Sequence, residues 1–451
     1  MTKKSDTMLA KIQAFIIQHQ LLDHDGHYLV AVSGGADSVC LLLVLQSLGY
    51  DVRAVHCNFM LRGEESQRDE DFVRELCQQR TIGLSLTHFD TRTYAALHKV
   101  SIEMAARTLR YNYFEHLRQD MGYNDICVAH HRDDSVETVL MNLIRGTGID
   151  GLKGISPRNG HVVRPLLCVT RQEIVEWLEQ KQQTFVTDSS NLVADIVRNQ
   201  LRLDILPRLS TLTPNAAGNI AATARHLSEA KKIYDQAVAD ALARLLSHGS
   251  LEISLLMKEP SPQCVLWEWL RTYGFTSATV EAICQALPQH QTGSEWCSVT
   301  HSVITHRGRL ILDKRQKERP TLRLPEMGTY AYDDATRFRL TMTAGAHIER
   351  IAHVACLDAD KMSYPLTLRP IRQGDRFQPF GMKGTKLVND YLTDRHLSLH
   401  EKRRQLVVVD ATGDILWLVG QRPDGRFCVG PKTVRTLTIE ELPVKNHSHL
   451  E

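Results

Sequence analysis

The chain has 451 residues, of which 43% are hydrophobic and 24% are charged, and its formal net charge is +2. These values suit a folded protein of about three domains, and they exclude recognition of nucleic acid through overall charge, so a basic surface would have to be local. The N-terminal stretch lacks the apolar core of a signal peptide, and the apolar run 39–45 is too short to cross a bilayer.

The ten cysteines are spread singly along the chain, and no C-x-x-C pair occurs. This spacing argues against a zinc knuckle and against a C-x-x-C redox site. It is typical of buried, reduced thiols. Together with the absence of a targeting segment, it predicts a cytoplasmic protein with no membrane attachment.

The first third of the chain alternates between strand and helix signals. This alternation predicts an α/β fold with a parallel, Rossmann-like sheet and helices on both of its faces. Ligands of such sheets bind beyond the carboxyl ends of the strands. The predicted strands are 28–32, 52–59, 84–89 and 125–130, and the predicted helices are 38–48, 64–80, 102–121 and 135–144.

The chain changes character after Leu206-Pro207, where helix signals begin to dominate. A charged segment, 314–320, reads as a solvated linker, and strand signals prevail after it. Short strands are predicted over 296–303, 309–312, 337–342, 366–368, 405–409 and 415–419. We therefore predict three domains, namely an α/β catalytic domain (1–212), a mainly helical domain (213–315) and a β-rich α+β domain (316–451).

The sequence Ser-Gly-Gly-Ala-Asp-Ser joins the first predicted strand to the first predicted helix. Glycines let backbone N–H groups converge on an anion, and the start of a helix adds positive partial charge. Asp37 would repel a phosphate, and Mg²⁺ bound by Asp37 would remove this conflict. The alternative is a glycine-rich turn in which Asp37 or Ser38 caps the helix. The pyrophosphate-binding residues predicted here are Ser33, Gly34, Gly35, Ala36, Asp37 and Ser38.

This loop lacks the lysine of a P-loop and the spacing of G-x-G-x-x-G. It resembles the PP-loop of the N-type ATP pyrophosphatases, which include GMP, NAD and argininosuccinate synthetases, tRNA thiolases and lysidine synthetases. The resemblance implies cleavage of ATP between its α- and β-phosphates and adenylation of a carbonyl-type oxygen.

Further segments are similar to the lysidine synthetase branch of this family and follow its order along the chain. Cys57 and Phe59 depart from the branch pattern. The similar segments are HCNFMLRGEES (56–66), EMAARTLRY (103–111), AHHRDDSVET (129–138), RGTG (145–148), DSSN (188–191), RNQLR (198–202), RQGDRF (372–377) and GMKGTK (381–386).

Charged side chains in these segments are the catalytic candidates. His130 ends the fourth predicted strand, at the ligand-binding edge of the sheet. Asp134 and Glu137 are three residues apart, so a helix places both on one face, where they would seat a substrate ammonium, unless they only form a capping box. Arg110, Arg198 and Arg202 match family positions implied in phosphate or tRNA contact, for which a guanidinium is well suited. The predicted catalytic set is Asp37, Arg110, His130, Asp134, Glu137 and Arg202.

Segment 361–404 has ten Lys or Arg residues and four Asp or Glu residues, so its net charge is +6. Phe377, Phe380 and Tyr391 are interspersed among the charges. This combination predicts a local nucleic-acid footprint. The alternative is a solvated charged face.

The resemblance implies transfer of L-lysine to C2 of the wobble cytidine in the CAU anticodon of tRNA(Ile), through an adenylated cytidine. This modification would change the specificity of the tRNA from methionine to isoleucine. ATP and Mg²⁺ are the expected cofactors, and tRNA(Ile) and L-lysine are the expected partners.

Two other functions are open at this point. One is a tRNA 2-thiolase of the same superfamily, against which the lack of paired cysteines argues. The other is a silent tRNA-binding protein, against which the presence of Asp37, Asp134 and Glu137 argues. The sequence leaves open the general base, the nucleotides that reject tRNA(Met), and the oligomeric state, with a homodimer among the options.

Overall fold

The computed structural model describes residues 2–187, 197–289, 292–315 and 319–443. The chain divides into two compact units, Met1–Asp235 and Gln236–Glu451, which are called unit 1 and unit 2 below. The division falls inside one long helix, α11 (Ala216–Leu245). Among the described helices, none combines the length and the apolar character that a membrane crossing requires.

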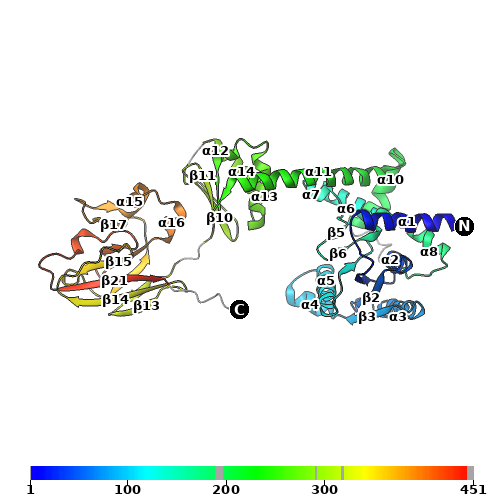
Figure 1. Cartoon of the computed structure of the whole chain (residues 1–451), viewed down its shortest axis with the longest axis horizontal. Coiled ribbons are helices and arrows are strands. Elements are labelled where there is room, and N and C mark those ends of the chain that lie inside the picture. The colour runs from blue at the N-terminus through cyan, green and yellow to red at the C-terminus, as the bar shows by residue number, and fades with distance from the viewer. Residues whose placement is uncertain (1, 188–196, 290–291, 316–318, 444–451) are drawn as a thin grey trace. The chain divides into compact units, whose positions relative to one another are not determined.

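Unit 1 is built on a twisted sheet whose described strands follow the order β3-β2-β1-β4-β6-β5. Figure 1 shows β2 and β3 of this sheet with helix α3 (Glu64–Gln79) next to them. All neighbours pair in parallel except β5 and β6, which are antiparallel. This confirms the predicted Rossmann-like α/β architecture. The strands are β1 (His27–Ala31), β2 (Asp51–Asn58), β3 (Gly83–His88), β4 (Asp125–Cys127), β5 (Arg158–Asn159) and β6 (Val162–Val163).

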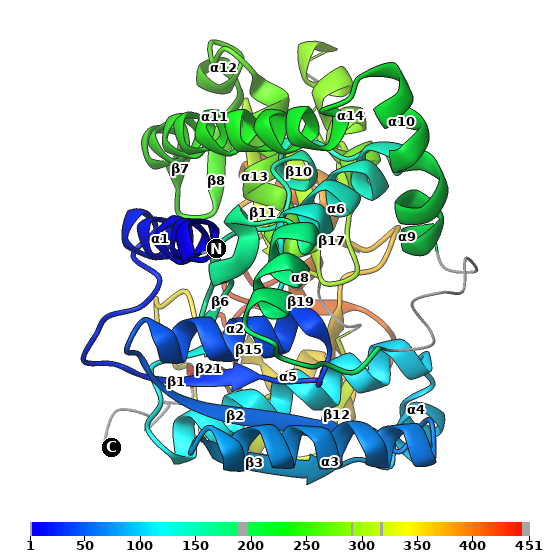
Figure 2. The ribbon, with the colours of Figure 1, turned by 90° about the vertical axis from the view of Figure 1, so that its right-hand side faces the viewer.

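Helices cover both faces of this sheet because successive side chains of a strand point to opposite sides. Tyr28 and Val30 face one core, and Leu29 faces the other. The first core is closed by α1 (Thr2–Gln18), α2 (Ala36–Ser47), α3 (Glu64–Gln79) and α8 (Arg171–Gln180). The second core is closed by α5 (Ile102–Asp120), which contributes Phe114. Figure 2 shows β1, β2 and β3 side by side, with α2 and α3 along them.

The apolar run 39–45 lies in α2, where every one of its residues is buried. A helix that is apolar all round has to be buried on all sides, and α2 meets this condition because it packs between the sheet and the helices α1 and α8. The apolar run 39–45 is therefore explained by the burial of α2 in the first core.

Several boundaries in unit 1 differ from the prediction. The fourth strand is shorter than predicted, and α6 (Arg132–Ile144) begins three residues before its predicted start. Pro207 lies in the first turn of α10 (Leu206–Leu212), directly after the π-helical turn Leu201–Ile205. Elements outside the prediction include α1, α4 (Thr91–His98), α7 (Ile149–Leu152), α8, α9 (Val197–Gln200) and the π-helical turn Leu201–Ile205.

Unit 2 begins with helices that pack on a sheet of order β7-β8-β11-β10-β9 within the described residues, where β7 is Leu246–Ser247 and β8 is Ser250–Glu252. The hydrophobic core between these helices and the sheet includes Trp269 and Ile283 from the helices and Val303 and Leu310 from the strands. Prominent elements are α13 (Pro262–Leu270), α14 (Ser277–Ala286), β9 (Glu295–Cys297), β10 (His301–His306) and β11 (Arg309–Lys314). The strands predicted at 296–303 and 309–312 correspond to β9, β10 and β11, whereas β7 and β8 were not predicted.

The rest of unit 2 is β-rich, as predicted. Its described residues form two antiparallel four-stranded sheets, β12-β16-β19-β20 and β13-β14-β21-β15, around one core that includes Trp417. Strand β21 (Arg435–Pro443), which was not predicted, pairs with both β14 (Thr336–Ala344) and β15 (Val354–Asp358). The other strands are β12 (Leu322–Leu324), β13 (Gly328–Ala331), β16 (Leu366–Pro370), β19 (Leu406–Val409) and β20 (Ile415–Leu418).

Candidate functional site

A cavity of about 640 Å³ lies at the carboxyl edge of the unit 1 sheet, the edge at which ligands of this sheet type bind. Among the described residues its lining is rich in arginine and includes fewer carboxylates, so it suits a polyanionic ligand. The charged residues that line it are Arg62, Arg107, Arg110, Arg171, Arg198, Arg202, Asp37, Asp69 and Asp134, and the histidines are His130 and His131.

The loop 33–38 forms one wall of this cavity. Ser38 holds the turn together, since its Oγ accepts from the backbone N–H of Ser33 (3.1 Å) and donates to the carbonyl of Gly35 (3.0 Å). Gly34 has a φ of +94°, which a residue with a side chain rarely adopts. The carbonyl of Gly34 accepts from the N–H of Val186 at 2.9 Å, which ties a distant segment to the loop.

Gly35 is the N-cap of α2, and no side chain caps the helix start. The alternative that Asp37 or Ser38 serves only as a helix cap is therefore wrong. The first N–H groups of α2 keep their capacity to bind an anion. Five of the six predicted loop residues line the cavity, while Gly34 provides the turn behind them.

Asp37 has one paired and one unpaired carboxylate oxygen. Its Oδ2 accepts from Nη1 of Arg171 at 2.5 Å. Its Oδ1 is buried and has no hydrogen-bond partner among the described residues. A buried carboxylate oxygen without a donor suits a hard cation such as Mg²⁺.

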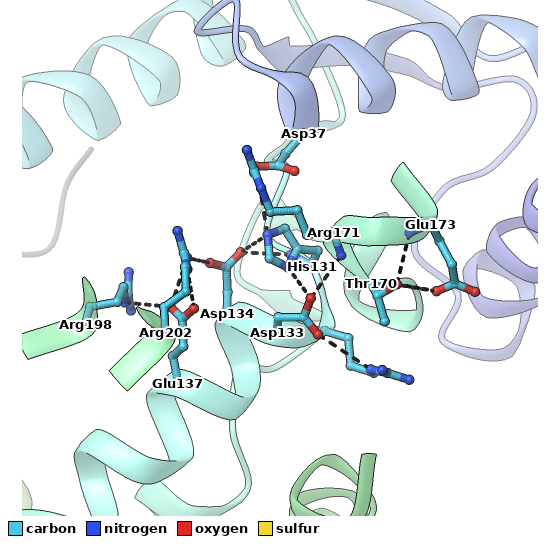
Figure 3. Close-up of polar contacts among 11 residues, drawn as sticks. Asp37, His131, Asp133, Asp134, Glu137, Thr170, Arg171, Glu173, Arg198 and Arg202 are labelled. Carbon is cyan, nitrogen blue, oxygen red and sulfur yellow. Dashed lines mark hydrogen bonds and ion pairs between the residues drawn. The ribbon is translucent and has the colours of Figure 1, made fainter. Parts of the chain in front are cut away.

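The segment His131–Asp134 carries a compact polar network at the start of α6 (Figure 3). The backbone N–H of His131 donates to Oδ2 of Asp134 at 3.0 Å, which forms a capping box. The buried His131 ring has Nε2 at 3.5 Å from Asp134 Oδ2 and 3.8 Å from Asp37 Oδ2. Asp133 Oδ2 accepts from the backbone N–H of Arg171 at 3.0 Å. His131 thus lies between the loop 33–38 and the acidic segment.

His130 lines the same cavity, and its Nδ1 is buried without a partner in the described part of the chain. Burial lowers the pKa of His130 to about 4, against the opposing effect of Asp134. The imidazole is therefore neutral near neutral pH, and a neutral imidazole is able to accept a proton.

Glu137 lies behind the cavity wall rather than on it, since the lining includes Asp134 and Arg202 but not Glu137. Its side chain is fully buried and accepts two hydrogen bonds from Arg202, at 2.7 and 3.1 Å. Burial raises the pKa of Glu137, and Arg202 opposes this rise. The capping box at this helix joins His131 to Asp134, so a box between Asp134 and Glu137 is wrong.

Two cavity arginines rest on aromatic rings. The guanidinium carbon of Arg110 lies 5.0 Å from the centre of the Phe59 ring, and that of Arg107 lies 5.0 Å from the centre of the Tyr111 ring. Within the described residues neither guanidinium has a hydrogen bond or an ion pair, so their donors stay available to a ligand. Phe59, a departure from the family pattern, therefore supports Arg110.

The sequence did not single out Arg171, His131 or Asp133 as functional. His131 and Asp133 could have been found from the sequence, because they lie next to the predicted residues in His-His-Arg-Asp-Asp (130–134). Arg171 carries no local signal, because its partner Asp37 is 134 residues away. The predicted segment 188–191 lies outside the described residues.

Several basic residues of the predicted unit 2 footprint have acidic partners within the chain. Arg403 donates to both oxygens of Glu295, at 2.6 and 2.7 Å. Arg404 pairs with Asp313, and Lys386 pairs with Asp394. Part of the positive charge in 361–404 therefore joins α16 (Leu399–Arg404) to the β9–β11 sheet, and the net charge of +6 overstates what a nucleic acid would meet.

Family comparisons agree with the geometry of the site. The profile of the PP-loop domain matches residues 4–209. The profile described as the TilS substrate binding domain matches residues 247–315. The first profile covers the sheet, the loop 33–38 and the whole described cavity.

Curated relatives match nearly the whole chain. The tRNA(Ile)-lysidine synthase of Bacteroides thetaiotaomicron is 44% identical over 428 residues, which cover 95% of this chain and 98% of the relative. The tRNA(Ile)-lysidine synthase of Parabacteroides distasonis is 44% identical over 440 residues, covering 96% and 100%. That of Porphyromonas gingivalis is 36% identical over 417 residues, covering 89% and 91%.

Proposed function

The chain belongs to the tRNA(Ile)-lysidine synthase family, and on this premise we propose that the unit 1 cavity joins L-lysine to the wobble cytidine of tRNA(Ile). The product is lysidine, formed at C2 of the cytosine in the CAU anticodon, and the tRNA changes from methionine to isoleucine specificity. ATP is consumed through the PP-loop domain, and AMP and pyrophosphate are released.

In the first step the C2 carbonyl oxygen of cytosine attacks the α-phosphorus of ATP. The bond from this phosphorus to the bridging oxygen breaks, and pyrophosphate leaves. The uncapped start of α2 and the Ser33 hydroxyl are suited to hold the pyrophosphate, while Ser38 keeps the turn in shape. The unpaired donors of Arg107 and Arg110 are suited to the charge on the reacting phosphate.

Mg²⁺ would be held by Asp37, whose Oδ1 is a buried acceptor without a donor. When bound, the ion would neutralise phosphate charge close to the Asp37 carboxylate. Arg171 already holds the other oxygen, so the carboxylate has a defined orientation.

In the second step the ε-amino nitrogen of lysine attacks C2, and AMP leaves with the former carbonyl oxygen. The amine has to be neutral to attack, so a base takes its proton. His130 is placed for this task because it lines the cavity and its buried Nδ1 has no partner among the described residues. Asp134 lines the cavity and suits the lysine ammonium, while Glu137 acts through Arg202, which it holds in place.

The observation that carries this proposal is that one cavity combines the uncapped helix start of the PP-loop, a histidine whose buried Nδ1 has no partner among the described residues, and an aspartate. The thiolase alternative has less support. Cys57 is the single cysteine in the described lining, and burial raises its pKa to about 12, so its thiolate is scarce. A silent binding protein would not require the catalytic groups.

Labelled lysine, ATP and total tRNA supplied to the purified protein test the proposal. We expect label in the isoleucine tRNA and one pyrophosphate released per lysine incorporated. In a parallel reaction with added sulfide as the sulfur donor, sulfur transfer to tRNA without lysine incorporation would favour the thiolase. Binding of tRNA without pyrophosphate release would favour a silent binding protein.

We also propose that unit 2 binds the tRNA outside the anticodon. The profile match at 247–315 supports this role for the first part of the unit. In the second part the basic residues without an ion pair in the described structure, such as Lys383 and Arg376, remain candidates for phosphate contact.

A further inference from the structure

Arg171 differs from the other arginines around the cavity because it pairs with the loop 33–38. Its Nη1 donates to Asp37 Oδ2 at 2.5 Å. The side chain is 40% exposed and lines the cavity, while that of Asp37 is 26% exposed. A positive charge thus stands beside the one carboxylate of the phosphate-binding loop.

The position of Arg171 is held from two sides. Its backbone N–H donates to Asp133 Oδ2 at 3.0 Å. Arg171 is also the first residue of α8, and a capping box fixes the start of this helix (Figure 3). In this box the backbone N–H of Thr170 donates to Glu173 Oε2 at 2.7 Å, and the backbone N–H of Glu173 donates to Thr170 Oγ1 at 3.1 Å. Asp133 therefore has a role distinct from that of Asp134, because it anchors the helix that carries Arg171.

We infer that Arg171 is the resident counter-ion of Asp37, a positioning residue that balances the charge of this carboxylate when a triphosphate binds. The inference rests on the proposed function, since the triphosphate is that of ATP. Without Arg171, the carboxylate and the phosphates would repel each other unless a divalent cation lay between them. With Arg171 in place, the loop accepts the triphosphate with or without the cation.

This role predicts that the contribution of Arg171 to nucleotide binding depends on whether Mg²⁺ is present. Loss of the Arg171 charge should weaken binding of metal-free nucleotide more than binding of the magnesium complex, because the cation replaces the missing positive charge. A merely structural role for Arg171 would weaken both to the same extent. The quantity that separates the two roles is the ratio of the dissociation constant in EDTA to that in excess Mg²⁺.

The test is calorimetric titration of the full chain with an ATP analogue that has a methylene bridge between the α- and β-phosphates. We expect Arg171→Gln and Arg171→Ala to raise this ratio by about fivefold or more, the lower end of common coupling free energies. Arg171→Lys keeps the charge and should stay within about twofold of the native ratio. The control is Arg80→Gln, because Arg80 is a surface residue that bonds Gln183 and does not line the cavity.

A double-mutant cycle with Asp37→Asn completes the test. In the Asp37→Asn background, Arg171→Gln should leave the ratio unchanged, because no carboxylate charge remains to be balanced. An unchanged ratio in Arg171→Gln and Arg171→Ala with Asp37 intact would overturn the inference while the proposed function stands. Absence of nucleotide binding by the native chain in both conditions would overturn the two together.

Discussion

Arg202 donates to Glu137 through two hydrogen bonds, from Nε to Oε1 at 2.7 Å and from Nη2 to Oε2 at 3.1 Å. Glu137 has no exposed side-chain surface, whereas Arg202 lines the cavity and also has Nη2 at 3.5 Å from Asp134 Oδ1. The two acids that are neighbours on α6 therefore have different surroundings: Asp134 faces the cavity, and Glu137 holds the arginine beside it.

Glu137→Ala should lower the free energy of unfolding by about 3–5 kcal/mol, the usual cost of removing one partner from a buried ion pair. The reason is that Arg202 would lose its carboxylate in a partly buried place. Thermal or urea unfolding measures the effect. Glu103→Ala, at an exposed position of α5, is the control and should change stability by less than about 0.5 kcal/mol. Equal stability of the two variants would contradict the structural role of Glu137.

Asp134→Asn should raise the KM for lysine by about tenfold or more, since a hydrogen-bonded charge of this kind contributes about 1.5–3 kcal/mol. Asparagine keeps an oxygen that accepts from the N–H of His131, so the helix start should persist. Formation of the adenylated tRNA, measured with labelled ATP and no lysine, should change much less. A KM equal to the native value would place the ammonium site elsewhere.

Asp37→Ala should reduce adenylate formation by at least about 10²-fold, in line with the loss of one electrostatic stabiliser of a transition state. Alanine suits the first turn of α2, so the fold should remain intact. The measurement is label transferred from ATP to tRNA, with circular dichroism as the check on folding. A native rate of adenylation would refute the metal-binding role of Asp37.

His130 should make stability depend on pH. Burial lowers the pKa of His130 from 6.5 to about 4, so the unfolded chain binds more protons between these values. The contribution of His130 to stability is therefore complete above pH 6.5 and is lost as the pH falls toward 4. Melting temperatures measured from pH 4 to 7 should show a shallower slope for His130→Asn than for the native chain. His116→Asn, at an exposed position, should keep the native slope.

The basic residues of unit 2 should fall into two groups, those that contact tRNA and those that stabilise the fold through an ion pair. Lys383 is exposed and has no ion pair in the described structure, so Lys383→Gln should weaken tRNA binding. The slope of log affinity against log salt should become shallower by about 0.7–0.9 if one phosphate contact is lost. Arg403→Gln removes the partner of Glu295 and should lower stability while leaving the salt slope unchanged. A shallower slope in Arg403→Gln alone would restore the footprint as first predicted.

The sequence by itself determined the features that depend on local chemistry. The loop 33–38 was readable because two adjacent glycines and flanking serines between a strand and a helix have few uses other than holding an anion. The alternation of strand and helix signals identified the parallel sheet, because hydrophobic periodicity is a property of neighbouring residues. The edge of the sheet that binds ligands followed from that topology.

Only the tertiary structure decided which charges become partners. Arg171 and Asp37 are 134 residues apart, Glu137 and Arg202 are 65 apart, and Arg403 and Glu295 are 108 apart. Each pair forms because the fold brings two distant segments together and removes them partly from water, where opposite charges attract more strongly. No local pattern records this choice, so the sequence could suggest a substrate contact for Glu137 and a nucleic-acid contact for Arg403 but could not show that each has a partner within the chain.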